Sequence, residues 1–291
     1  MNEGLTISNK VKLVECPRDA MQGWAHFIPT DKKIQYINEL LKVGFDTIDF
    51  GSFVSAKAIP QMADTHEVIK SIDLSGSNSK LLAIIANERG AADAVQYEAI
   101  SYLGFPFSVS ETFQQRNTNA SIEESLGRVA AIQNLCLKNK KELVVYMSMA
   151  FGNPYTDPYN EEIVFNWVNK LVAMDINIIS LADTVGVATP QQVSRVTQYL
   201  VDSLPQTEIG VHLHSTANNW QEKTAAALAA GCLRFDGALK GIGGCPMAGD
   251  DLVGNMDTEL MIPYFKEQHL LNELDEQALK RCTHMASEIF I

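Results

Sequence analysis

Short segments rich in β-branched and aromatic residues alternate with helical segments from one end of the chain to the other. The segments of the first kind, which we predict to be strands, span residues 11–17, 45–53, 80–87, 99–106, 142–151, 176–184, 208–214 and 234–241. The helical segments between them carry start signals, such as the capping box of Ser121 and Glu124 and the pair Thr189 and Pro190. Strands that are each followed by a helix predict an α/β fold of the (β/α)8 or TIM-barrel kind.

A doubly wound open sheet is the main alternative for such an alternation. That fold is typically accompanied by a GxGxxG turn or a P-loop, and the sequence contains neither. No low-complexity linker interrupts the alternation, so we expect residues 1–291 to form a single TIM-barrel catalytic domain. The segments least like regular structure are residues 112–121 and 242–255, which follow the fourth and the eighth predicted strands.

The composition of the chain disfavours some classes of binding partner. Hydrophobic residues make up 46% of the chain and charged residues 20%, which is typical of a protein with a large buried core. The formal net charge of −12 disfavours nucleic acid and anionic membranes as partners, and no apolar run approaches the ~20 residues of a membrane span.

The N-terminal residues lack the pattern of a signal peptide, and the five cysteines include no CxxC pair. We therefore expect a cytoplasmic protein, and a homodimer because closed symmetric pairs are the commonest assembly.

In TIM barrels the chemistry takes place at the carboxyl ends of the strands and in the loops that follow them. Polar and ionisable side chains are concentrated at these predicted positions. They are Arg18, Asp19, Asp49, Ser52, Tyr146, Ser148, Ser180, Asp183, His212, His214, Cys245 and Asn255. This set predicts an active site at the C-terminal mouth of the barrel.

His212 and His214 are separated by one residue in the sequence VHLH. On a strand, residues i and i+2 face the same way, so both imidazoles could bind one metal ion. On spacing alone, two structural histidines are the simpler interpretation. A carboxylate and an amide oxygen at other strand ends favour the metal site, because a buried aspartate beside two histidines otherwise lacks compensation. A donor set of nitrogen and oxygen suits Mg²⁺ or Mn²⁺ better than a structural zinc site.

Six stretches of the sequence resemble, in order, the 3-hydroxy-3-methylglutaryl-CoA lyase family, a branch of the barrel metallolyases. They read ECPRDAMQ, GSFVSAKAIPQMADTHEV, NASIEES, SLADTVGVATP, VHLH and GIGGCPMAGDDLVGN. The resemblance implies cleavage of 3-hydroxy-3-methylglutaryl-CoA, or of a close 3-hydroxyacyl-CoA, to acetoacetate and acetyl-CoA. It also implies a carbon–carbon lyase that uses Mg²⁺ or Mn²⁺ and takes part in leucine breakdown.

The resemblance implies roles for individual residues. The family's metal ligands fall on Asp19, His212, His214 and Asn255. Its catalytic residues fall on Arg18, Cys245, His212, Asp183 and Asp49, and its substrate-binding positions fall on Ser52, Tyr146 and Gln22. Asp49 departs from the family pattern, which usually has a glutamate there, one methylene longer.

The chemistry of such a cleavage explains these residue types. Breaking the C2–C3 bond of a tertiary alcohol requires removal of the hydroxyl proton and stabilisation of a thioester enolate, and a chelated cation assists the first of these. Arg18 carries a permanent charge that can stabilise the enolate oxygen. Cys245, on a glycine-rich loop, is the predicted general acid toward the acetyl-CoA carbanion, and His212 is a predicted proton carrier.

Each assignment has a structural alternative. Arg18 and Asp19 could form a local ion pair, Cys245 could fill a packing site, and Asp183 could cap or orient a neighbour. Tyr146 and Ser52 fit packing as well as substrate contact. For the function itself, the alternatives are a related barrel metallo-enzyme of the aldol or Claisen type, and a metal-binding barrel without catalysis.

Overall fold

The computed structural model describes residues 10–244 and 253–291. Its strands close into a barrel in the order β1 to β8, in which neighbouring strands are parallel and β8 pairs back to β1. The strands are β1 (Lys12–Glu15), β2 (Thr47–Ser52), β3 (Lys80–Ile84), β4 (Ile100–Ser108), β5 (Glu142–Ser148), β6 (Ile178–Ala182), β7 (Glu208–His212) and β8 (Arg234–Gly237). The predicted TIM barrel is confirmed.

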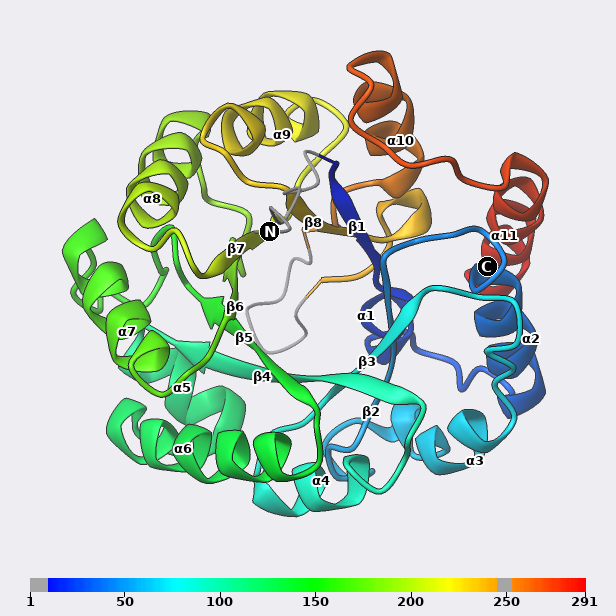
Figure 1. Cartoon of the computed structure of the whole chain (residues 1–291), viewed down its shortest axis with the longest axis horizontal. Coiled ribbons are helices and arrows are strands. Elements are labelled where there is room, and N and C mark those ends of the chain that lie inside the picture. Colours follow the sequence, from blue (N-terminus) through cyan, green and yellow to red (C-terminus); the bar gives the residue numbers. More distant parts are fainter. Residues whose placement is uncertain (1–9, 245–252) are drawn as a thin grey trace, which may run out of the picture.

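The helices surround the barrel (Figure 1). They are α1 (Pro17–Gln22), α2 (Thr30–Leu40), α3 (Thr65–Lys70), α4 (Glu88–Ala94), α5 (Glu111–Thr118), α6 (Ile122–Lys138), α7 (Glu161–Val172), α8 (Pro190–Ser203), α9 (Trp220–Ala229), α10 (Thr258–Glu267) and α11 (Glu276–Ile289), with 3-10 turns at Pro60–Met62 and Leu239–Gly241. Among the described residues, no helix combines the length and the apolar character that a membrane crossing requires.

Several predicted boundaries differ from the observed elements, for example the third, fifth and eighth strands, which end at Ile84, Ser148 and Gly237, and two differences have a clear local cause. Residues 112–121 lacked a regular pattern, but α5 occupies most of this stretch, and its N-cap Ser110 accepts a hydrogen bond from Phe113 N. The first predicted strand reached residue 17, whereas β1 ends at Glu15 and Pro17 begins α1. Proline has no N–H for a strand ladder and its fixed φ suits the first turn of a helix, so the chain leaves the sheet there.

Side chains on successive strand positions divide between two hydrophobic layers. One set faces the helices and forms the main core, for example Leu81, Leu103 and Val145. Their neighbours in the sequence, Leu82, Tyr102 and Val144, pack in a separate cluster that also contains Tyr146 and Ile178. This alternation follows from the two-residue period of a strand. The second cluster fills the barrel interior beneath the polar mouth.

Arg234 on β8 also lies inside the barrel, where its side chain is fully buried. Its Nη1 donates to Glu208 Oε1 at 3.2 Å. Gly210 on β7 makes room for the arginine, because a Cβ at that position would lie only 3.0–3.1 Å from the Arg234 side chain. The interior of the barrel therefore holds the buried guanidinium of Arg234, which needs the Glu208 carboxylate because an apolar layer would leave its charge unpaired.

Glu15 ties the end of β1 to the segment that follows β8. It is buried, its Oε1 accepts from Leu239 N at 2.8 Å and its Oε2 accepts from the Thr258 hydroxyl at 2.6 Å. Burial raises the pKa of Glu15 to about 8, although both hydrogen bonds act against this rise. The contact joins β1 to the start of α10 and fixes both ends of the segment that carries Asn255.

We expect Glu15→Gln to make the stability of the protein less sensitive to pH. Because the folded protein keeps a proton that the unfolded chain releases, the wild-type free energy of unfolding should fall between about pH 5 and pH 8, by at most ~1.4 kcal/mol per pH unit. The amide stays neutral and removes this contribution. Urea denaturation across this range measures the slope, with the exposed Glu162→Gln variant as a control. Equal slopes in all three proteins would contradict the argument.

Candidate active site

Helix α1 carries three of the predicted site residues on one short segment. Arg18 and Asp19 are buried, and Gln22 lies one turn further along. Side chains four residues apart lie on the same face of a helix, and Arg18 Nη1 donates to Gln22 Oε1 at 2.8 Å. Gln22 Nε2 in turn donates to Asp19 Oδ1 at 2.7 Å. The three side chains therefore hold one another in place.

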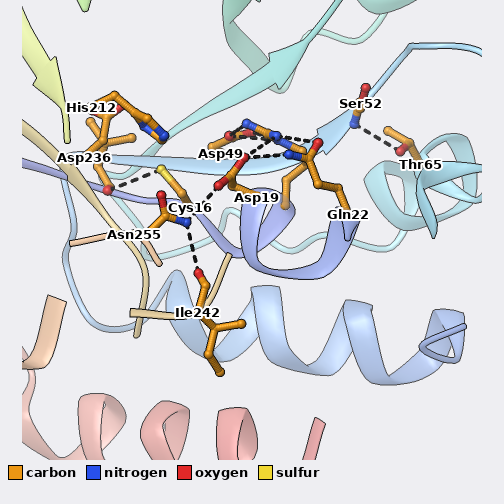
Figure 2. Close-up of polar contacts among 12 residues, drawn as sticks. Cys16, Asp19, Gln22, Asp49, Ser52, Thr65, His212, Asp236, Ile242 and Asn255 are labelled. Carbon is orange, nitrogen blue, oxygen red and sulfur yellow. Dashed lines mark hydrogen bonds and ion pairs between the residues drawn. The ribbon is translucent and has the colours of Figure 1, made fainter. Parts of the chain in front are cut away.

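Arg18 also joins α1 to β2. Its Nε lies 3.0 Å and its Nη2 2.5 Å from Asp49 Oδ2, and Nη1 lies 2.8 Å from Asp19 Oδ1. Figure 2 shows Asp19, Asp49 and Gln22 gathered at this point. The shorter aspartate therefore reaches the guanidinium without the methylene that a glutamate would add. With a carboxylate on two sides, the guanidinium plane has a fixed orientation.

The buried charges of the network shift one another's pKa values. Burial alone would raise the pKa of Asp19, but Arg18, His212 and His214 outweigh this effect and lower it. Burial raises the pKa of Asp49 to about 6 against the opposing effect of Arg18. Both carboxylates are thus ionised at neutral pH and can balance the arginine.

The two histidines lie where the sequence predicted them, at and just beyond the end of β7. One carboxylate oxygen of Asp19 and one ring nitrogen each of His212 and His214 lie within 4.8 Å of one another. All three side chains are shielded from solvent. Burial, and next the neighbouring His212, lower the pKa of His214 to about 3, so its imidazole is neutral at physiological pH. A neutral imidazole has the free lone pair that a metal ligand requires.

Asn255 completes the cluster from the far end of the chain. It pairs with His214 in an isolated β-bridge, and its Nδ2 donates to Asp19 Oδ2 at 2.8 Å and to the carbonyl of Ile242 at 2.9 Å. Its Oδ1 is buried and has no hydrogen-bond partner among the described residues. A buried amide oxygen of this kind, beside a carboxylate and two imidazoles, fits a divalent cation with mixed nitrogen and oxygen ligands.

Gly243 is required for this close approach. Its φ is +125°, and a Cβ there would lie 2.2 Å from Asn255 Nδ2 and 3.0 Å from Asp19 Oδ2. Any side chain would therefore displace the amide from the carboxylate.

A cavity of about 340 Å³ opens beside these residues. Arg18, Asp19, Gln22, His212 and His214 line its polar side together with Tyr146. Its apolar side is formed by Val54, Ala58, Ile59, Ile84, Ala86, Pro106 and Phe113. A small molecule that combines polar and aliphatic groups suits such a pocket.

Ser52 and Asp183 form contacts away from the cavity. The Ser52 hydroxyl accepts from Val54 N at 3.2 Å, which orients the chain behind the cavity wall. Asp183 accepts from Lys223 Nζ at 2.7 Å and from Ala188 N at 3.0 Å. Neither Ser52 nor Asp183 is among the residues that line the cavity in the described part of the chain. Cys245 lies outside the described residues.

Two polar residues of the site escaped the sequence analysis. Asp236 on β8 contacts His212, with 3.1 Å between Asp236 Oδ2 and Nδ1. Lys223 on α9 is buried and donates to both Asp183 and the carbonyl of His214. An acidic residue inside the predicted eighth strand was the only available signal for Asp236. A lysine within a helix is too common to indicate burial.

The fold and the site together define the class of protein. A parallel barrel that carries a buried guanidinium, two imidazoles, a carboxylate and an unpartnered amide oxygen at its carboxyl mouth is a TIM-barrel enzyme with a candidate metal centre.

Comparison with known proteins gives the family. Residues 10–285 match the model of the HMGL-like family, and the chain belongs to this family. It is a carbon–carbon lyase of the hydroxymethylglutaryl-CoA lyase-like type. The resemblance inferred from the sequence is confirmed.

Individual relatives cover most of the chain. The mitochondrial hydroxymethylglutaryl-CoA lyase of Mus musculus is 36% identical over 261 residues, which are 88% of this chain and 78% of the relative. The cytoplasmic 3-hydroxy-3-methylglutaryl-CoA lyase of Rattus norvegicus is 35% identical over 253 residues, or 87% of this chain and 73% of the relative. The solved HMG-CoA lyase from Acenitobacter baumannii, in complex with coenzyme A and 3-methylmalate, is 32% identical with a TM-score of 0.89, covering 98% of this chain and 92% of that one.

Removal of the Asp49 carboxylate should destabilise the protein far more than removal of an exposed carboxylate. Asp49→Ala leaves Arg18 buried without its bidentate partner, and we expect the free energy of unfolding to fall by about 3 kcal/mol. Glu123→Ala removes an exposed ion pair with Lys170 and should cost less than about 1 kcal/mol. Urea denaturation measures both values. Losses of similar size would mean that the Arg18–Asp49 contact does not stabilise the fold.

Proposed function

We propose that this protein cleaves 3-hydroxy-3-methylglutaryl-CoA, or a close 3-hydroxyacyl-CoA, to acetoacetate and acetyl-CoA with Mg²⁺ or Mn²⁺ bound at the site. The proposal rests on the convergence of Asp19, His212, His214 and the unpartnered oxygen of Asn255 beside Arg18. The curated lyases and the relative solved with coenzyme A support an acyl-CoA substrate.

In this reaction the 3-hydroxyl group loses its proton and the C2–C3 bond breaks. The electron pair of that bond forms the thioester enolate, which then takes a proton at carbon to give acetyl-CoA. A bound divalent cation would lower the pKa of the hydroxyl group and orient the substrate. Asp19, His212, His214 and Asn255 are the residues that would hold the cation, and His212 would carry the hydroxyl proton only while its Nε2 is not a cation ligand.

Arg18 would stabilise the enolate oxygen. Its side chain lines the cavity and is held by Asp49, Asp19 and Gln22. Because these contacts exist before substrate binds, the guanidinium needs no reorganisation when negative charge develops. Arg18 lines the cavity even though both carboxylates contact it, so the guanidinium can meet a bound substrate.

The remaining predicted residues would act around this centre. Tyr146 lines the cavity, which supports a substrate contact. Gln22 and Ser52 would shape the same wall, and Asp183 would act through Lys223 on the carbonyl of His214. Cys245 would protonate the enolate carbon as the loop general acid. We also propose a cytoplasmic homodimer, in line with a cytoplasmic relative.

The direct test is cleavage of 3-hydroxy-3-methylglutaryl-CoA by purified protein, measured as acetoacetate formed. Activity should disappear with a chelator and return with Mg²⁺ or Mn²⁺. Lack of turnover with several 3-hydroxyacyl-CoA thioesters at saturating cation would reject the proposal.

We expect Arg18→Met to lower kcat by about 10²-fold or more, because it removes a donor that acts mainly in the transition state. Binding of Mn²⁺, measured by electron paramagnetic resonance, should persist because the cation ligands remain. Lys33→Met is a matched control, since Lys33 is a buried cation paired with Asp64 at 2.8 Å and lies outside the cavity lining. A similar loss of kcat in both variants would assign the Arg18 effect to folding.

We expect Asn255→Ala to weaken Mn²⁺ binding by about tenfold or more, since it removes a proposed ligand and a hydrogen bond that orients Asp19. Titration of free Mn²⁺ by electron paramagnetic resonance gives the dissociation constant. The control is Asn139→Ala, whose amide donates to Leu135 at the exposed end of α6. Unchanged affinity in Asn255→Ala would remove this residue from the ligand set.

A further inference from the structure

Asp236 and His212 occupy neighbouring strands inside the barrel. Gly210 and Val211 of β7 pair with Arg234 and Phe235 of β8, which sets His212 and Asp236 side by side one residue further along. His212 Nδ1 and Asp236 Oδ2 are 3.1 Å apart, and the Asp236 side chain has no exposed surface. Figure 2 shows Asp236 next to His212, with Cys16 and Asn255 nearby.

We propose that Asp236 is a positioning residue that holds His212 with Nδ1 protonated and the lone pair of Nε2 directed away from Asp236, toward Asp19 and His214. A carboxylate accepts hydrogen bonds and does not donate, so its contact with Nδ1 requires the proton on that nitrogen. Nε2 lies on the opposite edge of the ring and is unprotonated in the neutral imidazole. This arrangement is what a metal-binding imidazole needs.

The inference depends on the cation site of the proposed function and adds a residue that acts through one of its ligands. The tautomer of His212 is also a property of the metal-free protein, so it can be measured whether or not a cation binds.

The positive charge of Arg234 compensates the buried carboxylate of Asp236. Burial alone would lower the pKa of Arg234, but Asp236 is the largest opposing influence and the pKa is raised. Two of its nitrogens, Nε and Nη2, have no hydrogen-bond partner within residues 10–244 and 253–291, and neither has Asp236 Oδ1. In the same part of the chain the Tyr146 and Ser180 hydroxyl groups also lack partners, and these two residues pair across β5 and β6. Buried polar atoms gathered in this way are typically bridged by ordered water.

This interior layer would hold Asp236 from the side opposite His212. Tyr146, Ser180, Gly210 and Arg234 are register partners across β5 to β8, one step below His212 and Asp236. The missing side chain of Gly210 gives Arg234 its space. Asp236 therefore lies directly above this layer, on the same face of β8 as Arg234.

Cys16 is the third group at this position. Its Sγ donates to the carbonyl of Val14 at 3.7 Å, and its thiol, one Asp236 oxygen and one His212 nitrogen lie within 4.8 Å of one another. Burial, followed by the nearby Asp236, raises the pKa of this thiol well above its usual value. Because the neutral thiol donates its proton to the carbonyl of Val14, Asp236 stays paired with His212.

The test compares Asp236→Ala and Asp236→Asn with the wild-type protein in the metal-free state. Long-range proton–nitrogen correlation spectra of histidine-labelled protein report the tautomer, and the His212 signals are assigned by their loss in His212→Gln. We expect the Nδ1–H form in the wild type and a shift toward the Nε2–H form in Asp236→Ala. Asp236→Asn should retain the Nδ1–H form, because the amide oxygen can still accept the bond.

Binding of Mn²⁺ supplies a second readout. Asp236→Ala should weaken it by about 10- to 100-fold, with Asp236→Asn between this value and the wild type. Asp64→Asn is the matched control, since it also converts a largely buried carboxylate to an amide but pairs with Lys33 and Thr30, away from the cavity lining. Its Mn²⁺ affinity should equal that of the wild type.

Two results would overturn the inference. One is a folded Asp236→Ala protein that keeps the Nδ1–H tautomer and the wild-type Mn²⁺ affinity. The other is a sulfur-to-metal charge-transfer band with Co²⁺ that Cys16→Ala abolishes, because Asp236 would then belong to a ligand set with the thiol. If the wild type fails to bind Mn²⁺, the proposed function fails, and the tautomer comparison still decides the role of Asp236.

Discussion

The site depends on one buried guanidinium placed between two carboxylates. Arg18 contacts Asp49 on β2 and Asp19 within α1, and all three side chains are nearly inaccessible to solvent. Burying such charges is costly unless each is paired in good geometry, and removal of one partner leaves the others uncompensated. The planar fork of arginine satisfies both carboxylates at once, which lysine could not do. The direction of α1, and with it the position of Asp19, follows from this arrangement.

The other residues of the centre are likewise fixed from beneath by buried charged or polar groups on neighbouring elements. Lys223 joins Asp183 to the carbonyl of His214, Glu15 fixes the segment around Asn255, and Asp236 contacts His212. Each of these contacts joins residues from different elements or segments of the barrel. The precision of the mouth is thus largely a property of the closed barrel, since these supports reach the ligands from other elements.

The sequence was sufficient for the barrel and for the residues at its mouth, because both depend on local patterns. Strand–helix alternation is visible in any window of the chain, and the VHLH spacing alone brings two imidazoles to one face. Asp236 and Lys223 could not be predicted, because their partners lie on other elements and come near only when the sheet closes. Asp183 followed the strand-end rule yet turns toward Lys223, since a buried lysine attracts the nearest carboxylate. Pro17 marked the end of β1, but the helix it starts is only six residues long and too short for a periodic pattern.

The charges of the site also explain why a divalent cation would suit an anionic substrate. Asp19 and Asp49 carry two negative charges, Arg18 carries one positive charge, and the pKa of His214, lowered to about 3, keeps that ring neutral. Arg18, Asp19 and Asp49 together therefore carry one negative charge, in a chain whose formal net charge is −12. A bound divalent cation would reverse that sign while Arg18 keeps its orientation. The positive charge of Arg234, beneath Asp236, offsets the negative charge of that carboxylate. Asp236 therefore adds little to the repulsion of an anionic substrate.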